Sequence, residues 1–264
     1  MTQTAEQHTT DALFARDAVR AAYHLALLEP PYSRHVEWRG HRAPGGQLDA
    51  AAAFYHLSRP TIIFLLGEAG GVGGCLASAD LPEHAYVAFF PEHQPVLDEF
   101  YLMPSKVEMV RMVLGRDEFV RHATDGLPEP VVLNDEHVDA LDALYSFDTG
   151  FRPDAYQYSL GRYLGIFADG RMVAAAGTHF AAEDRSFAMI GNVLTHPDYR
   201  RRGLARLVVQ RLLARLFGSV GTVCLNVRGD NAPGVKLYES LGFSARCTYR
   251  EGCSVLRRMA RNSP

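Results

Sequence analysis

The pattern of hydrophobic and polar positions is clearest between Ile190 and Phe217. The apolar residues around Val193 and Leu194 predict a buried strand, which Pro197 ends. A helix follows, because apolar residues then recur at helical spacing and form one broad stripe: Leu204, Leu207, Val208, Leu212, Leu216 and Phe217. The polar positions fall on the other side of this helix: Arg206, Gln210, Arg211 and Arg215. The segment therefore predicts a strand, a sharp turn and a helix.

The remainder of the second half alternates strands and helices. Asn134 is expected to cap a helix that follows a short strand at 131–133. Asp169-Gly170 predicts a hairpin turn. The other expected elements are strands at 163–167, 172–180, 186–195 and 222–227, a helix at 235–241 with Gly242 as its C′ residue, and a closing hairpin of 243–249 and 254–258.

The first half has a less regular pattern. We expect a helix from Thr9 or Thr10 to Leu28, strands at 36–38, 61–66 and 85–90, helices at 95–101 and 117–122, and an extended segment at 107–114. Residues 48–57 fit either a helix or an extended segment. The glycine-rich segment 67–74 is interpreted as a turn between two strands, the second at 75–77. Pro128 and Pro130 predict a linker, and hence domains at 1–130 and 131–264.

The turn before the helix carries the candidate chemistry. Residues 200–205 read Arg-Arg-Arg-Gly-Leu-Ala and open a helix whose first N–H groups have no partner within it. The helix dipole and the arginines add positive potential, and Gly203 and Ala205 let an anion approach the backbone. A phosphate or pyrophosphate site is one interpretation. A basic surface turn before a core helix is the other.

Two motifs in this half resemble those of the GNAT N-acetyltransferase superfamily. Arg200, Gly203 and Ala205 match its Gln/Arg-x-x-Gly-x-Gly/Ala pattern, and the segment from Asn231 through Tyr238 to Gly242-Phe243 is similar to its second motif. The resemblance implies an α/β fold with a mixed, mostly antiparallel sheet and helices on both faces. Residues 62–76 weakly repeat the pattern of 164–177, so the first lobe is interpreted as a degenerate GNAT-like domain.

The same resemblance implies an N-acetyltransferase that moves the acetyl group of acetyl-CoA to a primary amine, without a metal. Leu194 is expected to polarise the thioester carbonyl through its backbone N–H, and Tyr238 to be the general acid. The candidate cofactor-binding residues are Val193, Leu194, Thr195, Arg200, Arg201, Arg202, Gly203, Leu204, Ala205, Arg206, Asn226, Asn231 and Tyr238. Structural roles stay open for three of these: a packed aromatic ring for Tyr238, a helix cap for Asn231 and a backbone partner for Asn226.

The general base and the acceptor are less defined. His179, Glu183 and Asp184 are candidate bases, and ordered water is the alternative. The aromatic segment 146–161 and the closing hairpin are expected to select a small-molecule or peptide amine. Two competing functions are an acyltransferase that uses a longer acyl-CoA, similar to glycine N-acyltransferases, and a non-catalytic acyl-CoA sensor. A third is nucleotide binding, which is weakened because this sequence contains no second nucleotide-binding motif.

Charge and cysteine content narrow the class of protein. The net charge of −3 predicts no general affinity for nucleic acid. Residues 1–130 contain 10 Lys/Arg and 17 Asp/Glu, while residues 131–264 contain 17 and 13, so the half with the candidate phosphate loop is the positive one. The four cysteines fit no common zinc spacing. No signal-peptide pattern and no apolar run of about 20 residues is present. We therefore expect a cytoplasmic monomer or homodimer without membrane contact.

Overall fold

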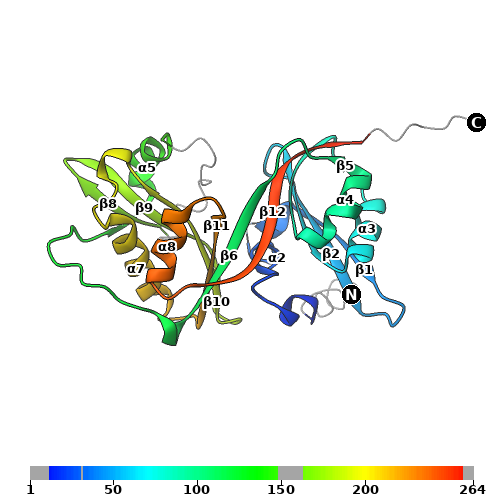
Figure 1. The fold of residues 1–264 in the computed structure, drawn as a ribbon, viewed down its shortest axis with the longest axis horizontal. Helices are drawn as coiled ribbons and strands as arrows, with labels where there is room; N and C mark the ends of the chain where they lie inside the picture. The colour runs from blue at the N-terminus through cyan, green and yellow to red at the C-terminus, as the bar shows by residue number, and fades with distance from the viewer. Residues whose placement is uncertain (1–11, 31, 148–162, 258–264) are drawn as a thin grey trace, which may run out of the picture. The chain divides into compact units, whose positions relative to one another are not determined.

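The computed structural model describes residues 12–30, 32–147 and 163–257 (Figure 1). The chain divides into two compact units. The N-terminal unit comprises Met1–Val110, Arg228–Asp230 and Cys247–Pro264, and the C-terminal unit comprises Arg111–Val227 and Asn231–Arg246. The sequence suggested a boundary after residue 130. The first boundary between the two units instead lies between Val110 and Arg111, inside a strand, because residues 111–130 pack with the C-terminal unit.

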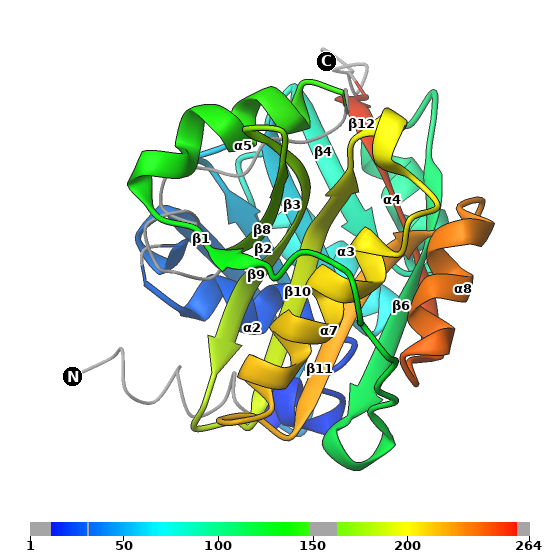
Figure 2. The same ribbon diagram turned by 90° about the vertical axis from the view of Figure 1, so that its left-hand side faces the viewer.

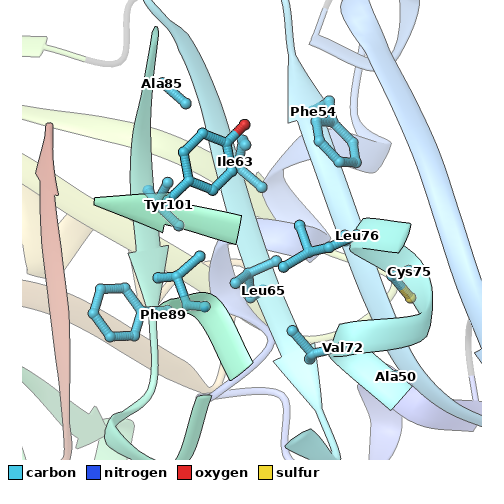
Figure 3. Close-up of a cluster of buried hydrophobic side chains, with 13 residues drawn as sticks. Ala50, Phe54, Ile63, Leu65, Val72, Cys75, Leu76, Ala85, Phe89 and Tyr101 are labelled. Atoms are coloured by element: carbon cyan, nitrogen blue, oxygen red, sulfur yellow. The ribbon is translucent and has the colours of Figure 1, made fainter. Parts of the chain in front are cut away.

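The N-terminal unit is a sheet with helices. Its elements are α2 (Ala22–Leu28), β1 (Val36–Arg42), β2 (Leu48–Tyr55), β3 (Thr61–Gly67), α3 (Ala69–Ala77), β4 (His84–Phe89), α4 (Gln94–Phe100) and β5 (Tyr101–Leu102). Strands β1, β2 and β3 are antiparallel, whereas β3 and β4 are parallel and are joined by α3. Apolar side chains of α3 and β3 meet in the core, with Val72 and Leu76 near Leu65 and Ile63 (Figure 3).

The glycine-rich segment after β3 is the helix α3, not the turn and strand that the sequence suggested. Its glycines allow close packing rather than a turn. A Cβ on Gly71 would lie 2.7 Å from the Cβ of Ala50, and one on Gly74 would lie 2.6 Å from Cδ2 of His41. The missing side chains therefore let this helix lie close to β1 and β2.

Other differences in this region are smaller. The predicted helix to Leu28 is interrupted by a turn at residues 18–21, so that α2 begins only at Ala22. The ambiguous segment 48–57 is the strand β2, which is buried on both faces. The helix expected at 117–122 is reduced to a 3₁₀ turn, Arg116–Glu118. The predicted strands at 36–38, 61–66 and 85–90 and the helix at 95–101 are confirmed.

The C-terminal unit has a mixed sheet of order β6-β11-β10-β9-β8-β7. Its elements are β6 (Val107–Gly115), which begins in the N-terminal unit, then β7 (Val131–Val132), α5 (Val138–Tyr145), β8 (Tyr163–Ala168), β9 (Arg171–Ala182), β10 (Phe187–Thr195), α7 (Leu204–Leu216), β11 (Thr222–Arg228) and α8 (Ala232–Ser240). The pairs from β7 to β10 are antiparallel, and β10 and β11 are parallel. Asp169 and Gly170 both have positive φ, which confirms the predicted hairpin turn.

Helix α7 buries the predicted apolar stripe, including Leu207 and Leu212. It also buries Gln210, which the sequence placed on the polar side. The reason is the segment 119–130, which crosses α7 (Figure 2). The side chain of Gln210 accepts a hydrogen bond from the N–H of His122 at 2.7 Å and donates to its carbonyl at 3.0 Å. An amide side chain thus satisfies both backbone groups of a covering segment.

The expected closing hairpin is a single strand, β12 (Ser244–Leu256). It starts in the C-terminal unit and ends in the N-terminal unit, where it pairs antiparallel with β4. Residues 250–253, between the two predicted strands, pair with β4 instead, and Gly252 pairs with Val87 within that ladder. A Cβ there would lie 2.3 Å from the carbonyl oxygen of Ser105, so the glycine accommodates a close backbone approach.

The two units repeat one order of elements. In each unit, three antiparallel strands are followed by a helix, by a strand that is parallel to the third strand, and by a second helix. This order is β1-β2-β3-α3-β4-α4 in the N-terminal unit and β8-β9-β10-α7-β11-α8 in the C-terminal unit. The weak sequence repeat does not follow this order. Residues 62–76 cover β3 and α3, whereas residues 164–177 cover β8 and β9, which correspond in position to β1 and β2.

Candidate functional site

Strands β10 and β11 pair only over part of their length. Their parallel register runs from Phe187 and Thr222 to Ile190 and Leu225. Beyond these pairs β10 continues to Thr195 and β11 to Arg228, with no further pairing between the two strands among the described residues. The backbone groups that face between the two strands beyond Ile190 and Leu225 therefore have no ladder partner from the other strand. We call this region the splay.

Strand β10 carries a bulge where the splay begins. Its register with β9 shifts between Gly191 and Leu194, and Asn192 within the bulge has a φ of 53°. The ladder with β9 resumes with the pairs of Leu194 with Ala175 and Thr195 with Ala174. A bulge redirects the backbone groups that follow it.

The resumed register determines where the backbone N–H groups point. The N–H of His196 donates to the carbonyl of Val173 at 2.8 Å. Hydrogen-bonded pairs alternate along an antiparallel ladder, so the pair of Leu194 with Ala175 is also of this kind. The N–H of Leu194 therefore faces β9, and the N–H of Thr195 faces the other edge. The N–H of Leu194 is therefore not directed into the splay, where it was expected to polarise the thioester carbonyl.

The candidate phosphate loop lies at the end of β10, before α7. A 3₁₀ turn, Pro197–Tyr199, follows the strand, and Arg201 and Gly203 then adopt left-handed φ values of 61° and 79°. Gly203 is the N-cap of α7. Left-handed residues before a helix can turn successive N–H groups toward one point, which suits an anion.

Two arginine side chains of this loop donate hydrogen bonds to nearby backbone carbonyls, and one of them also contacts an aromatic ring. Nε of Arg200 donates to the carbonyl of Thr195 at 3.3 Å, and Arg202 donates to the carbonyl of Asp198 at 2.9 Å. The guanidinium of Arg202 lies 4.8 Å from the ring centre of Tyr199. These cations remain largely exposed, so they can exchange their backbone contacts for an anionic ligand.

Tyr238 lies on α8, whose start is capped by Asn231. The side chain of Asn231 accepts a hydrogen bond from the N–H of Gly234 at 3.0 Å, so the helix-cap role is present. Tyr238 is only 8% exposed, and its ring centre lies 5.9 Å from that of Phe243. Burial raises the pKa of the Tyr238 hydroxyl above its ordinary value. The group is therefore protonated at neutral pH, as a proton donor must be.

Asn226 is the first residue of β11 beyond the paired segment. Its side-chain oxygen accepts a hydrogen bond at 2.8 Å from Nε of Arg111, which is 1% exposed. The side chain of Asn226 is thus engaged by a side chain of β6. Nothing in the sequence marked Arg111, because a lone arginine in an apolar strand carries no motif.

The candidate bases lie at different distances from the splay. Glu183 and Asp184 follow β9 in the turn that leads to Phe187, at the other end of β10. A surface depression lined by Arg116 and Ser186 also lies at that end. His179 is closer, since its Nε2 lies 2.1 Å from the position of a Cβ on Gly191. Burial lowers the pKa of His179 to about 4.

Most of the predicted acceptor segment, 146–161, lies outside the described residues. The closing hairpin, also assigned to the acceptor, is the strand β12. Within the described part of the chain, no group of three or more His, Cys, Asp or Glu could hold a metal ion. No helix in that part is both long and apolar enough to cross a membrane.

The C-terminal unit thus combines a mixed α/β sheet, a parallel strand pair that ends at Ile190 and Leu225, and an arginine-rich loop before the following helix. Residues 132–243 match the model of the Acetyltransferase (GNAT) family. The resemblance inferred from the sequence is confirmed for this domain.

Curated relatives match a shorter part of the chain. The [Ribosomal protein bS18]-alanine N-acetyltransferase of Salmonella typhimurium is 41% identical over 86 residues, which are 31% of this chain and 56% of that protein. The corresponding protein of Escherichia coli K12 is 38% identical over 86 residues, with the same coverage. The chain thus spans about half the length of these relatives.

Solved structures resemble nearly the whole chain. A Drosophila protein covers 97% of both chains with a TM-score of 0.71 at 15% identity. A GCN5-related N-acetyltransferase from Kribbella flavida covers 91% of this chain and 98% of its own, with a TM-score of 0.64 at 16% identity. At these identities the likeness concerns the fold, which agrees with the mixed α/β fold expected from the sequence.

Proposed function

We propose that the protein is an N-acetyltransferase that moves the acetyl group of acetyl-CoA to a primary amine. The observation that carries the proposal is the splay, which opens beside the loop that precedes α7. The amine nitrogen attacks the thioester carbonyl carbon and forms the C–N bond. The C–S bond then breaks, the nitrogen loses a proton and the thiolate gains one.

The cofactor would be held along the splay. Residues Arg200 to Arg206 offer backbone N–H groups and positive charge to the pyrophosphate. The N–H of Thr195 faces away from β9, where it can pair with the amide-containing arm of the cofactor. Val193 and Asn226 border the same opening, and Asn231 lies at the start of α8.

Tyr238 is the proposed general acid. Its hydroxyl is protonated at neutral pH and would donate that proton to the leaving thiolate, although the raised pKa makes it a weaker acid than an exposed tyrosine. We assign no single base. The low pKa of His179 makes it a weak proton acceptor at neutral pH, so removal of the amine proton through ordered water remains the proposal.

The relatives suggest the first acceptor to test. Their name describes N-acetylation of an alanine of a ribosomal protein. We propose a primary amine of a peptide or small molecule, and a peptide with an N-terminal alanine is the first choice. Because such an acceptor belongs to the ribosome, we place the activity in the cytoplasm. Oligomeric state, a monomer or a homodimer, stays part of the proposal.

The test measures thiol release from acetyl-CoA with an N-terminal alanine peptide and with pooled amines. We expect acceptor-dependent release that falls at least about tenfold in Tyr238→Phe, equivalent to roughly 1.4 kcal/mol of barrier. Tyr101→Phe is the matched control, because Tyr101 is a buried tyrosine of the N-terminal unit whose hydroxyl donates to the carbonyl of Pro82. Its release rate should equal that of the unmodified protein.

Each outcome separates the competing functions. Equal rates in the protein and in Tyr238→Phe would exclude Tyr238 as the general acid. Release with longer acyl-CoA donors at higher rates would favour the second candidate, an acyltransferase of glycine N-acyltransferase type. Acetyl-CoA binding without release for any donor or amine would favour a sensing module.

A further inference from the structure

We propose that Tyr145 and Tyr163 are positioning residues that hold Asn192 so that the N–H of Val193 is aimed at the acyl carbonyl. This inference rests on the proposed function, which needs a hydrogen-bond donor to the thioester oxygen. It assigns the donor to Val193 in place of Leu194, whose N–H faces β9.

The backbone of Asn192 leaves the regular strand geometry. Its φ of 53° lies in the left-handed region, which Asn tolerates better than most residues. In the register with β9, neither Asn192 nor Val193 has a partner, since the pairs pass from Gly191 to Leu194. The peptide between Asn192 and Val193 is therefore oriented by groups outside the ladder.

Tyr145 orients this peptide through its carbonyl. The hydroxyl of Tyr145, at the end of α5, donates a hydrogen bond to the backbone oxygen of Asn192. The C=O and N–H of a trans peptide point in opposite directions. A carbonyl held toward Tyr145 therefore directs the N–H of Val193 away from α5. Tyr145 is itself rigid, because it is 3% exposed in the cluster formed by α5 with β8 and β9.

Tyr163 holds the side chain of the same residue. Nδ2 of Asn192 donates to the hydroxyl oxygen of Tyr163, which is fully buried on β8. The ring of Tyr163 occupies space that Gly177 leaves free, since a Cβ on Gly177 would lie 2.2 Å from its Cζ. Gly177 on β9 thus permits the contact between Tyr163 and the bulge.

The two hydroxyls together fix both the backbone and the side chain of Asn192. A donor that is oriented before the reaction stabilises the developing oxyanion without reorganisation at the moment of attack. Loss of either hydroxyl would leave the cofactor-binding loop at 200–206 unchanged but allow the peptide to rotate. The effect should therefore appear in kcat and not in cofactor affinity.

The experiment compares Tyr145→Phe, Tyr163→Phe and Asn192→Gly with the matched control Tyr101→Phe. Glycine at 192 retains access to the left-handed φ but loses the side-chain contact. We expect kcat to fall about tenfold or more in Tyr145→Phe, less in the other two, and the Kd for acetyl-CoA to change less than about twofold, since one oxyanion donor contributes about a hundredfold or more when it is removed entirely.

A spectroscopic readout tests the same point without turnover. The infrared carbonyl band of bound acetyl-CoA labelled with ¹³C at the thioester carbonyl should shift toward the band of the free cofactor in Tyr145→Phe, and not in Tyr101→Phe. Binding with an unchanged band and unchanged kcat would overturn the positioning role alone. Failure of the unmodified protein to bind acetyl-CoA would overturn the proposed function as well.

Discussion

Three residues with left-handed φ lie where the proposed cofactor would meet the backbone. Asn192, Arg201 and Gly203 all have positive φ, and each lies in the bulge or in the loop before α7. Such conformations cost free energy for most side chains and persist where the surrounding structure imposes them. Their location in the bulge of β10 and in the loop before α7 therefore supports the proposed cofactor site at the level of single residues.

Gly203→Ala should weaken both folding and cofactor binding. At its φ of 79° an alanine is strained by about 1–2 kcal/mol. A clash is not the cause, because the nearest atom to the added Cβ, Cδ1 of Leu127, lies 3.6 Å away. Urea denaturation and acetyl-CoA titration measure the two effects. In the control Gly45→Ala, which has open space and no positive φ, the free energy of unfolding should change by less than about 0.5 kcal/mol.

His179 should make stability depend on pH. Its folded pKa of about 4 lies below the ordinary value of 6.5, so between these values the unfolded state binds a proton that the folded state does not. The free energy of unfolding should therefore decrease as the pH falls from about 6.5 toward 4. Urea denaturation at several pH values should show a smaller decrease for His179→Gln. Some dependence will remain, because burial also lowers the pKa of His93. An identical decrease in the variant would contradict the assignment.

At the level of elements, segment 119–130 is part of the framework of the GNAT domain and not a linker. It is tied to α7 by Gln210, as described above, and to α8 by the Nε2 of His122, 2.7 Å from the carbonyl oxygen of Ser240. The carboxylate of Glu129 pairs with Arg211 of α7 at 2.8 Å. Two prolines in this segment suggested a linker, but the contacts that hold the segment come from helices distant in sequence.

Gln210→Ala should destabilise the C-terminal unit by about 1–3 kcal/mol. The substitution leaves the N–H and the carbonyl of His122 without their side-chain partner in a partly buried position. Thermal or urea denaturation measures the loss. Arg215→Ala, on an exposed position of the same helix, is the control and should change the unfolding free energy by less than about 0.5 kcal/mol. Equal effects of both substitutions would show that Gln210 does not anchor the segment.

At the level of the whole molecule, the two units share an order of elements but differ in the residues at the N-terminus of the first crossover helix, α3 in one and α7 in the other. In the N-terminal unit, β3 passes into α3 through Gly67 and Glu68, and Glu68 is the N-cap. The carboxylate of Asp49 lies near Gly71 in the first turn of α3. Negative charge at a helix N-terminus opposes a second anion. We propose that this unit is a GNAT-like lobe without a cofactor site.

The chain should therefore bind one acetyl-CoA. Isothermal titration calorimetry is expected to give a stoichiometry of one per chain, and the double variant Arg200→Ala, Arg201→Ala should lower the affinity of that single site. The matched double variant Arg39→Ala, Arg42→Ala removes two exposed or partly exposed arginines of β1 and should leave the affinity unchanged. A stoichiometry of two would contradict the absence of a site in the N-terminal unit.

The sequence by itself determined the local features of the GNAT domain. The Asp169-Gly170 turn, the cap at Asn134 and the apolar stripe of α7 were all predictable, because turn chemistry and helical periodicity depend on neighbouring residues. The motif around Gly203 could also be recognised, because it consists of residues that are close together in the sequence.

Tertiary structure alone decided the features that depend on residues far apart in the chain. The glycines of α3 indicated a turn, because their closeness to β1 and β2 could not be read from the sequence. The continuous strand β12 was predicted as a hairpin, because its pairing with β4 depends on residues far apart in the chain. The direction of the Leu194 N–H depends on its register with Ala175, and the hold on Asn192 depends on two tyrosines from other elements. A local pattern cannot specify these contacts, because each requires a partner that only the folded chain brings close.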